Sequence, residues 1–145
     1  MDVYGLVLIV HLLCAILFVG FIFADVVVFR GLLVKYTKEE TQAIKETIYT
    51  RGVKIYPPAV LLLIGSGGYM FSKHINSTLG YFDTPLQILL WIKFFLVLCI
   101  VAGVGYALSC RVRNKTEAAF MNYFHLIALF LGIAISILAK VMFMV

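Results

Sequence analysis

Residues 3–29 have the sequence VYGLVLIVHLLCAILFVGFIFADVVVF, in which only the side chains of His11 and Asp25 are ordinarily charged or partly charged at neutral pH. A helix needs about 20 mainly apolar residues to cross a bilayer, and this stretch is longer than that. Three further stretches meet the same requirement: residues 55–73, 85–110 and 120–145. The sequence therefore predicts an all-α integral membrane protein, with residues 1–145 forming a single domain, a transmembrane four-helix bundle.

The composition agrees with a membrane protein. Of the 145 residues, 63% are apolar, whereas roughly half is typical of a soluble domain. The formal net charge is +5, but the basic residues fall in short segments between apolar stretches rather than on one folded surface. This distribution indicates membrane orientation and argues against nucleic acid as a partner. The three cysteines show no C-x-x-C spacing, so neither a disulfide framework nor a zinc knuckle is predicted.

The basic residues also predict the topology. Most of them lie in the two segments that follow the first and third apolar stretches: Arg30, Lys35, Lys38, Lys45, Arg51, Lys54, Arg111, Arg113 and Lys115. Cytoplasmic loops carry such an excess of Lys and Arg, so we expect both segments in the cytoplasm and both termini outside it. In a bacterium this corresponds to the inner membrane with periplasmic termini.

Local signals mark several helix ends. Thr37 and Glu40 have the spacing of a capping box, which predicts a short amphipathic helix in the first cytoplasmic loop. This helix would lie along the inner surface or extend the second spanning helix inward. Pro57, Pro58 and Pro85 are expected in the first turns of the second and third spanning helices, where a missing N–H costs little.

Two glycine clusters fall inside predicted spanning helices. They are Gly65, Gly67 and Gly68 in one helix and Gly103 and Gly105 in another. Small residues let helix backbones approach closely in lipid, so we expect both clusters at helix contacts.

Five ionisable side chains fall inside the predicted spans: His11, Asp25, Lys93, His125 and Lys140. Each costs at least about 2.5 kcal/mol at the centre of a bilayer, so each calls for a structural or functional reason. A rise of about 1.5 Å per residue places His11, Lys93 and Lys140 at a similar depth, towards the outer side. Asp25 and His125 fall in the inner half.

This depth pattern suggests a cofactor site. Two lysines beside a histidine repel a bare divalent cation but suit haem b, with His11 as axial ligand and Lys93 and Lys140 as partners of the propionates. The two histidines differ in depth by about 15 Å, so one haem held by both is disfavoured. His125 is instead a candidate ligand of a second haem.

Copper is the alternative metal. Imidazole, thiol and thioether groups suit Cu(I), and such groups gather towards the outer side. The alternative copper set is His11, Cys14, Met70, His74 and Met142. A third interpretation is an assembly subunit without a cofactor, whose buried charges pair with each other and whose glycine faces bind a partner.

The chain resembles the copper-resistance CopD membrane family and, more distantly, the HemJ-type protoporphyrinogen oxidases. The resemblance lies in HLLCAILFVG at residues 11–20, the Pro57-Pro58 pair followed by IGSGGY, and TPLQILLWIKFFLVL at residues 84–98. Asn122 and Lys140 in the last helix are similar to a HemJ pattern. Where that family has an asparagine-glutamate-x-proline motif, this chain has Asn122-Tyr-Phe-His125.

Similarity to HemJ implies b-haem binding and electron transfer from a porphyrinogen, with His11 and Lys93 at the positions of that family's transmembrane histidine and lysine. Similarity to CopD implies copper transport. The leading hypothesis is a haem b protein of the bacterial inner membrane with a redox or electron-transfer role. Its partners would be a quinone, a porphyrin or a redox protein, in addition to the lipid bilayer and a second copy of the chain. An oxidoreductase activity of the protoporphyrinogen-oxidase type stays open.

Overall fold

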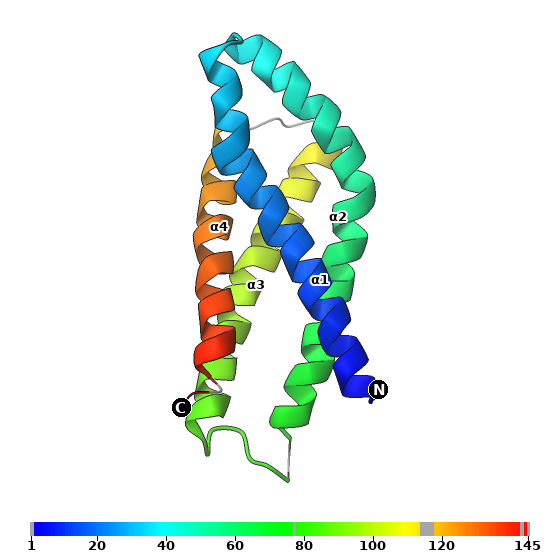
Figure 1. Ribbon diagram of the computed structural model, residues 1–145, viewed down its shortest axis with the longest axis vertical. Helices are drawn as coiled ribbons and strands as arrows, with labels where there is room; N and C mark the ends of the chain where they lie inside the picture. Colours follow the sequence, from blue (N-terminus) through cyan, green and yellow to red (C-terminus); the bar gives the residue numbers. More distant parts are fainter. Residues whose placement is uncertain (1, 77, 114–117, 143, 145) are drawn as a thin grey trace. The chain divides into compact units, whose positions relative to one another are not determined.

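The protein is described by a computed structural model that covers residues 2–76, 78–113, 118–142 and 144. The chain forms two compact units, Met1–Lys73 and His74–Val145. The first is built on helices α1 and α2, and the second on α3 and α4 (Figure 1). The predicted all-α fold with four long helices is confirmed.

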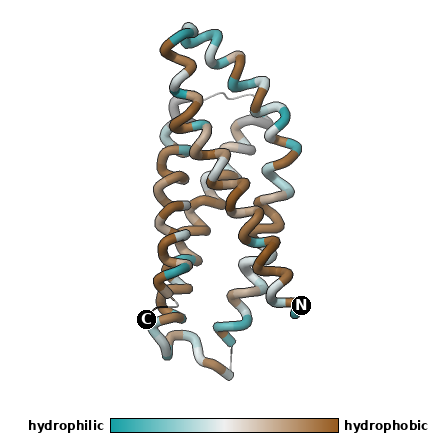
Figure 2. The backbone as a smooth tube through the Cα atoms, in the orientation of Figure 1, coloured by the Kyte–Doolittle hydropathy of each residue, from teal (hydrophilic) through white to brown (hydrophobic). Residues whose placement is uncertain are grey.

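Each long helix has the length and composition to cross a membrane. The helical segments that contain an apolar stretch of this length are Val3–Val34, Lys38–His74, Pro85–Ala107 and Tyr123–Val141. Figure 2 shows apolar residues along most of their length and hydrophilic ones mainly in the first half of α2 and near the helix ends. Many large apolar side chains on these helices are exposed, which lipid tolerates and water does not. The fold thus fits an integral membrane protein.

The first helix changes its winding near its end. Helix α1, Val3–Phe23, begins after Asp2, whose carboxylate accepts a hydrogen bond from the backbone N–H of Gly5 at 3.3 Å. A π-helical turn η1, Ala24–Val28, and a 3-10 helix η2, Phe29–Val34, continue it. The predicted helix over residues 3–29 is therefore extended by five residues. The π-turn also rotates every later side chain away from its α-helical position.

Helix α2, Lys38–His74, differs most from the prediction. Pro57 and Pro58 lie inside it, so the expectation that they mark its start is wrong. The helix instead begins at the capping box. The backbone N–H of Thr37 donates to the Glu40 carboxylate at 2.9 Å, and the N–H of Glu40 donates to the Thr37 hydroxyl at 3.3 Å.

The predicted amphipathic segment is thus the first part of α2. At about 1.5 Å per residue the 37-residue helix is about 55 Å long, well beyond the roughly 30 Å of a hydrocarbon core. The polar half before Ile55 therefore extends outside the membrane. Of the two interpretations of the first loop, the structure supports an extension of the second helix, and the side of the membrane on which it lies stays a prediction.

Helices α3, Pro85–Val112, and α4, Ala118–Val141, pack directly on each other. The ring of Phe124 lies on Gly103, where a Cβ atom would meet the ring's Cε2 at 1.9 Å. This contact confirms a packing role for Gly103. Helix α3 begins at Pro85, as predicted, whereas α4 is shorter at its end than the predicted 120–145.

Candidate functional site

The hydrogen bond between His11 and Ser66 joins α1 to α2. The imidazole of His11 is half-buried, and its Nδ1 lies 2.9 Å from the Ser66 hydroxyl oxygen. That hydroxyl donates its own hydrogen to the carbonyl of Leu62 at 2.6 Å. While the hydroxyl hydrogen is used in this bond, Ser66 offers a lone pair to His11, and an N–H at Nδ1 of the imidazole can donate to it.

This hydrogen-bond direction selects one tautomer of His11. With the hydrogen on Nδ1, the lone pair of the neutral ring is on Nε2. A hydrogen bond to one ring nitrogen that fixes the other as an acceptor is the usual arrangement around a metal-binding histidine. In this tautomer the hydrogen bond to Ser66 would orient the His11 ring in the way that a metal-binding histidine is usually oriented.

Gly67 provides the space in which the His11 ring lies. A Cβ atom at Gly67 would be 3.1 Å from Cε1 and 3.6 Å from Nδ1 of the imidazole. A distance of 3.1 Å is tighter than an ordinary van der Waals contact, so any larger side chain would displace the ring. The predicted packing role of Gly67 is confirmed, and the residue it accommodates is the candidate ligand itself.

The first unit also carries two further members of the copper set. Cys14, one turn beyond His11 in α1, is buried, and Met70 in α2 is half-buried. Among residues 2–76, 78–113, 118–142 and 144, no three His, Cys, Asp or Glu side chains come close enough together to hold a metal ion.

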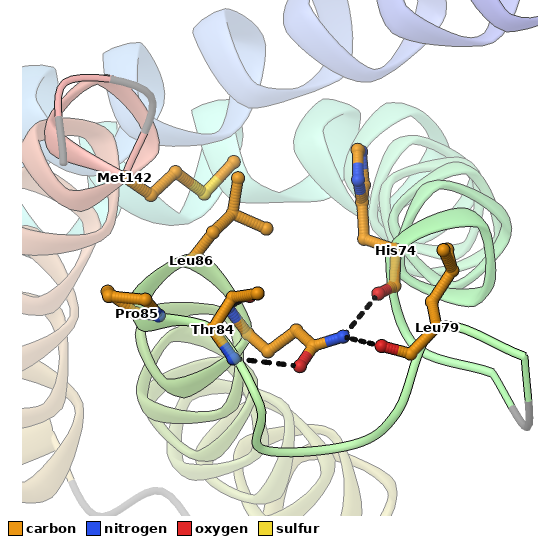
Figure 3. A pocket seen from close by; sticks show the side chains of 7 residues that line it. His74, Leu79, Thr84, Pro85, Leu86 and Met142 are labelled. Atoms are coloured by element: carbon orange, nitrogen blue, oxygen red, sulfur yellow. Dashed lines mark hydrogen bonds between the residues drawn. The ribbon is translucent and has the colours of Figure 1, made fainter.

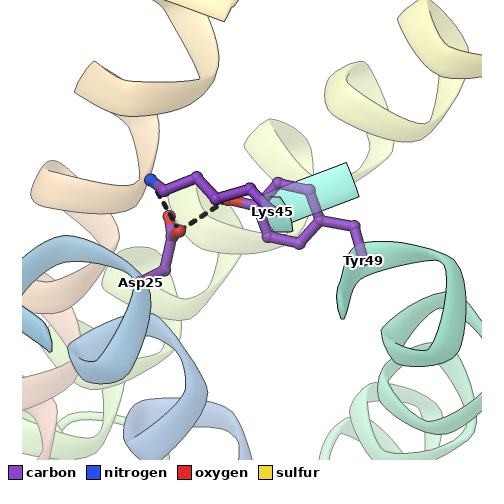
Figure 4. Close-up of polar contacts among 3 residues, drawn as sticks. All are labelled: Asp25, Lys45 and Tyr49. Carbon is purple, nitrogen blue, oxygen red and sulfur yellow. Dashed lines mark hydrogen bonds and ion pairs between the residues drawn. The ribbon is translucent and has the colours of Figure 1, made fainter. Parts of the chain in front are cut away.

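A buried ion pair lies at the π-turn of the first unit. Asp25 is 2% exposed, and its carboxylate lies 3.0 Å from the ammonium group of Lys45 and accepts a 2.6 Å hydrogen bond from the Tyr49 hydroxyl (Figure 4). Both of these partners are residues of α2. An aromatic contact also joins α1 to α2: the centroids of the Phe21 and Tyr56 rings lie 4.0 Å apart.

The second unit has a pocket of about 450 Å³. His74 and Met142, both proposed as copper ligands, line it from opposite sides (Figure 3). His74 is half-buried and Met142 is 6% exposed. Leu86 lies between them, and the other lining residues are Leu79, Thr84, Pro85 and Gln87. An imidazole and a thioether thus face the same space.

The remaining predicted site residues also belong to the second unit. Lys93 in α3 is half-buried, and Lys140 in the last turn of α4 is exposed. His125 is half-buried beside Phe124, with 6.1 Å between the ring centroids. The grouping of His11 with the two lysines joins residues of both units and stays a prediction. The side chain of Asn122 lies outside the described part of the chain.

The sequence interpretation missed four residues of these sites. Ser66, Lys45 and Tyr49 are long-range partners for which no local pattern exists. Gln87 had a local signal, because Thr84-Pro-Leu-Gln87 has the spacing of a capping box. The box is formed: the N–H of Gln87 donates to the Thr84 hydroxyl at 3.3 Å, and the N–H of Thr84 to the Gln87 carboxamide oxygen at 3.2 Å.

The chain matches no protein-family model, no curated protein and no solved structure. The resemblance to the CopD and HemJ families stays a prediction carried by the sequence motifs.

Proposed function

We propose that the protein is a haem b-binding membrane protein with a role in electron transfer, and that His11 is the axial ligand. The observation that supports this is the 2.9 Å hydrogen bond between His11 Nδ1 and the Ser66 hydroxyl: when Nδ1 donates in it, the lone pair of the neutral ring is on Nε2. When bound, haem b would supply a one-electron carrier.

The residues around His11 have distinct roles in this proposal. Ser66 orients the imidazole and holds the hydrogen on Nδ1. Gly67 leaves the ring its space, and a larger side chain there would move the ligating nitrogen. The membrane-spanning helices keep water away. Lys93 and Lys140 are proposed partners of the propionates, and His125 a proposed ligand of a second haem.

A comparison of two serine variants tests the role of Ser66. Ser66→Ala removes the acceptor of His11 Nδ1–H, whereas Ser72→Ala removes an exposed hydroxyl of the same helix that donates only to the carbonyl of Tyr69. Loss of a residue that orients a metal ligand costs roughly 10- to 100-fold in affinity. Titration of haem into the purified full-length chain should show this loss for Ser66→Ala and none for Ser72→Ala. Equal affinities of both variants and the unaltered chain would refute the assignment.

Copper binding is the second candidate, favoured by the presence of His74 and Met142 in one pocket. It predicts that Cu(I) is retained by the purified chain and lost on Met142→Leu, with haem binding unaffected. Retention of Cu(I) by Met142→Leu would refute copper binding in this pocket. A cofactor-free assembly subunit is the remaining alternative, and it predicts a co-purifying partner and neither metal.

We further propose that both termini lie outside the cytoplasm, in the bacterial inner membrane. The supporting observation is the concentration of Lys and Arg before and within the polar half of α2 and after α3. Fusion of a periplasm-active reporter to either end should give activity, and fusion of a cytoplasm-active reporter should not. The opposite pattern at either end would overturn this topology.

A further inference from the structure

The segment between α2 and α3 has apolar side chains on its surface. In the aromatic loop, defined as residues 78–84, Leu79 is 54% exposed, Tyr81 52% and Phe82 65%. Exposure to water costs about 25 cal/mol for each Å² of apolar surface, so a short loop in water has little reason to present three such side chains. In contact with lipid instead of water, these side chains would not carry this free-energy cost.

Several backbone groups of the same loop are hydrogen-bonded from within the protein. The carboxamide nitrogen of Gln87 donates to the carbonyls of His74 and Leu79 at 3.1 and 3.0 Å (Figure 3). It also donates to the carbonyl of Gly80 at 3.1 Å. Its oxygen accepts from the N–H of Asp83 at 2.8 Å. The Gln87 side chain is 3% exposed, so these bonds are shielded from solvent.

Trp91 completes this internal network. Its indole N–H donates to the carbonyl of Tyr81 at 3.0 Å, and its ring stacks on Phe82 with 5.5 Å between centroids and 17° between planes. A loop in water can leave such carbonyls to the solvent, whereas a loop in a water-poor layer has to satisfy them internally. Trp and Tyr also prefer the boundary between headgroups and acyl chains.

The position along the chain fits the same layer. The loop joins two helices that are long enough to cross a membrane. Trp91 lies six residues after Pro85, about 9 Å along α3, a depth comparable to that of the headgroup region. We propose that the aromatic loop binds the lipid bilayer itself, with Leu79, Tyr81 and Phe82 inserted among the headgroups and upper acyl chains. It then anchors this end of α3 independently of any cofactor.

Trp91 is the only tryptophan of the chain, so its fluorescence reports on this site. The full-length protein would be reconstituted into phosphatidylcholine vesicles whose lipids carry bromine near the headgroup or near the middle of the acyl chain. We expect Trp91 to be quenched more by the upper bromines than by the deeper ones. The double variant F82W/W91F moves the tryptophan to residue 82 of the loop. Its fluorescence should also be quenched more by the upper bromines than by the deeper ones. Aqueous iodide should quench it less than it quenches free tryptophan.

A second double variant serves as the depth control. L98W/W91F places the reporter on an exposed position of α3, seven residues and about 10 Å further along the helix than Trp91. There the deeper bromines should quench more, so the order reverses. The proposal is overturned if Trp91 and the reporter at residue 82 are unaffected by both brominated lipids, or if iodide quenches the latter as strongly as free tryptophan.

Discussion

Replacing Lys45 by Met tests whether the buried ion pair fixes the π-turn of the first helix to α2. Asp25 is 2% exposed and the Lys45 side chain 13%, so the substitution leaves a carboxylate where water hardly reaches. Removing one partner of a buried ion pair costs about 3–5 kcal/mol. Because Tyr49 would still donate its hydrogen bond to Asp25, we expect about 3 kcal/mol, the lower end of that range.

The assay is reversible unfolding in mixed micelles with increasing dodecyl sulfate, followed by far-ultraviolet circular dichroism. A loss of about 3 kcal/mol corresponds to a roughly 100-fold change in the folding equilibrium. Lys54→Met is the matched control, because Lys54 is an exposed lysine of the same helix. Its free energy of unfolding should change by less than about 0.5 kcal/mol.

A double variant separates the charge from the packing. In Asp25→Asn with Lys45→Met no charge is left buried, and Tyr49 can still hydrogen-bond the amide, so the loss should fall to about 1 kcal/mol. The reasoning is refuted if Lys45→Met is no more destabilising than Lys54→Met. It is also refuted if the double variant loses more stability than Lys45→Met alone.

The remaining predictions concern two close glycine contacts, each with a nearby glycine as control. Gly67→Ala should weaken haem binding measurably, because its Cβ would lie 3.1 Å from the His11 ring. Gly65→Ala should bind haem as the unaltered chain does, because no described atom lies within 4 Å of its Cβ. Gly103→Ala should lower the free energy of unfolding by about 1–3 kcal/mol because its Cβ overlaps the ring of Phe124. Gly105→Ala, with open space around its Cβ, should be neutral or slightly stabilising in the same assay.

The long apolar stretches and the local capping signals were sufficient to predict most of the fold. Four helices followed from hydropathy and the start of α3 from Pro85. The pairing of Thr37 with Glu40 predicted a helix start, but the second spanning helix was expected to begin only at residue 55. Pro57 and Pro58 misled because an isolated pair of prolines looks like a helix start. Helix α2 continues through both residues, although prolines have no backbone N–H to donate.

The candidate site was predictable only in part, for a physical reason. His11 stood out because an ionisable residue in lipid needs a partner, but which residue meets it depends on how two helices pack. Ser66 is 55 residues away in sequence, and no local pattern connects the two. The partners of Asp25 were missed for the same reason, because Tyr49 is 24 residues away in sequence and Lys45 belongs to the same helix as Tyr49.

The measurement that tests the central claim most directly is the dithionite-reduced minus air-oxidised absorption spectrum of the purified full-length chain, produced with haem supplied. The account predicts the Soret and visible bands of a haem b protein, and their loss or displacement in His11→Ala. An unaltered chain without these bands, or a His11→Ala variant with an unchanged spectrum, would contradict it.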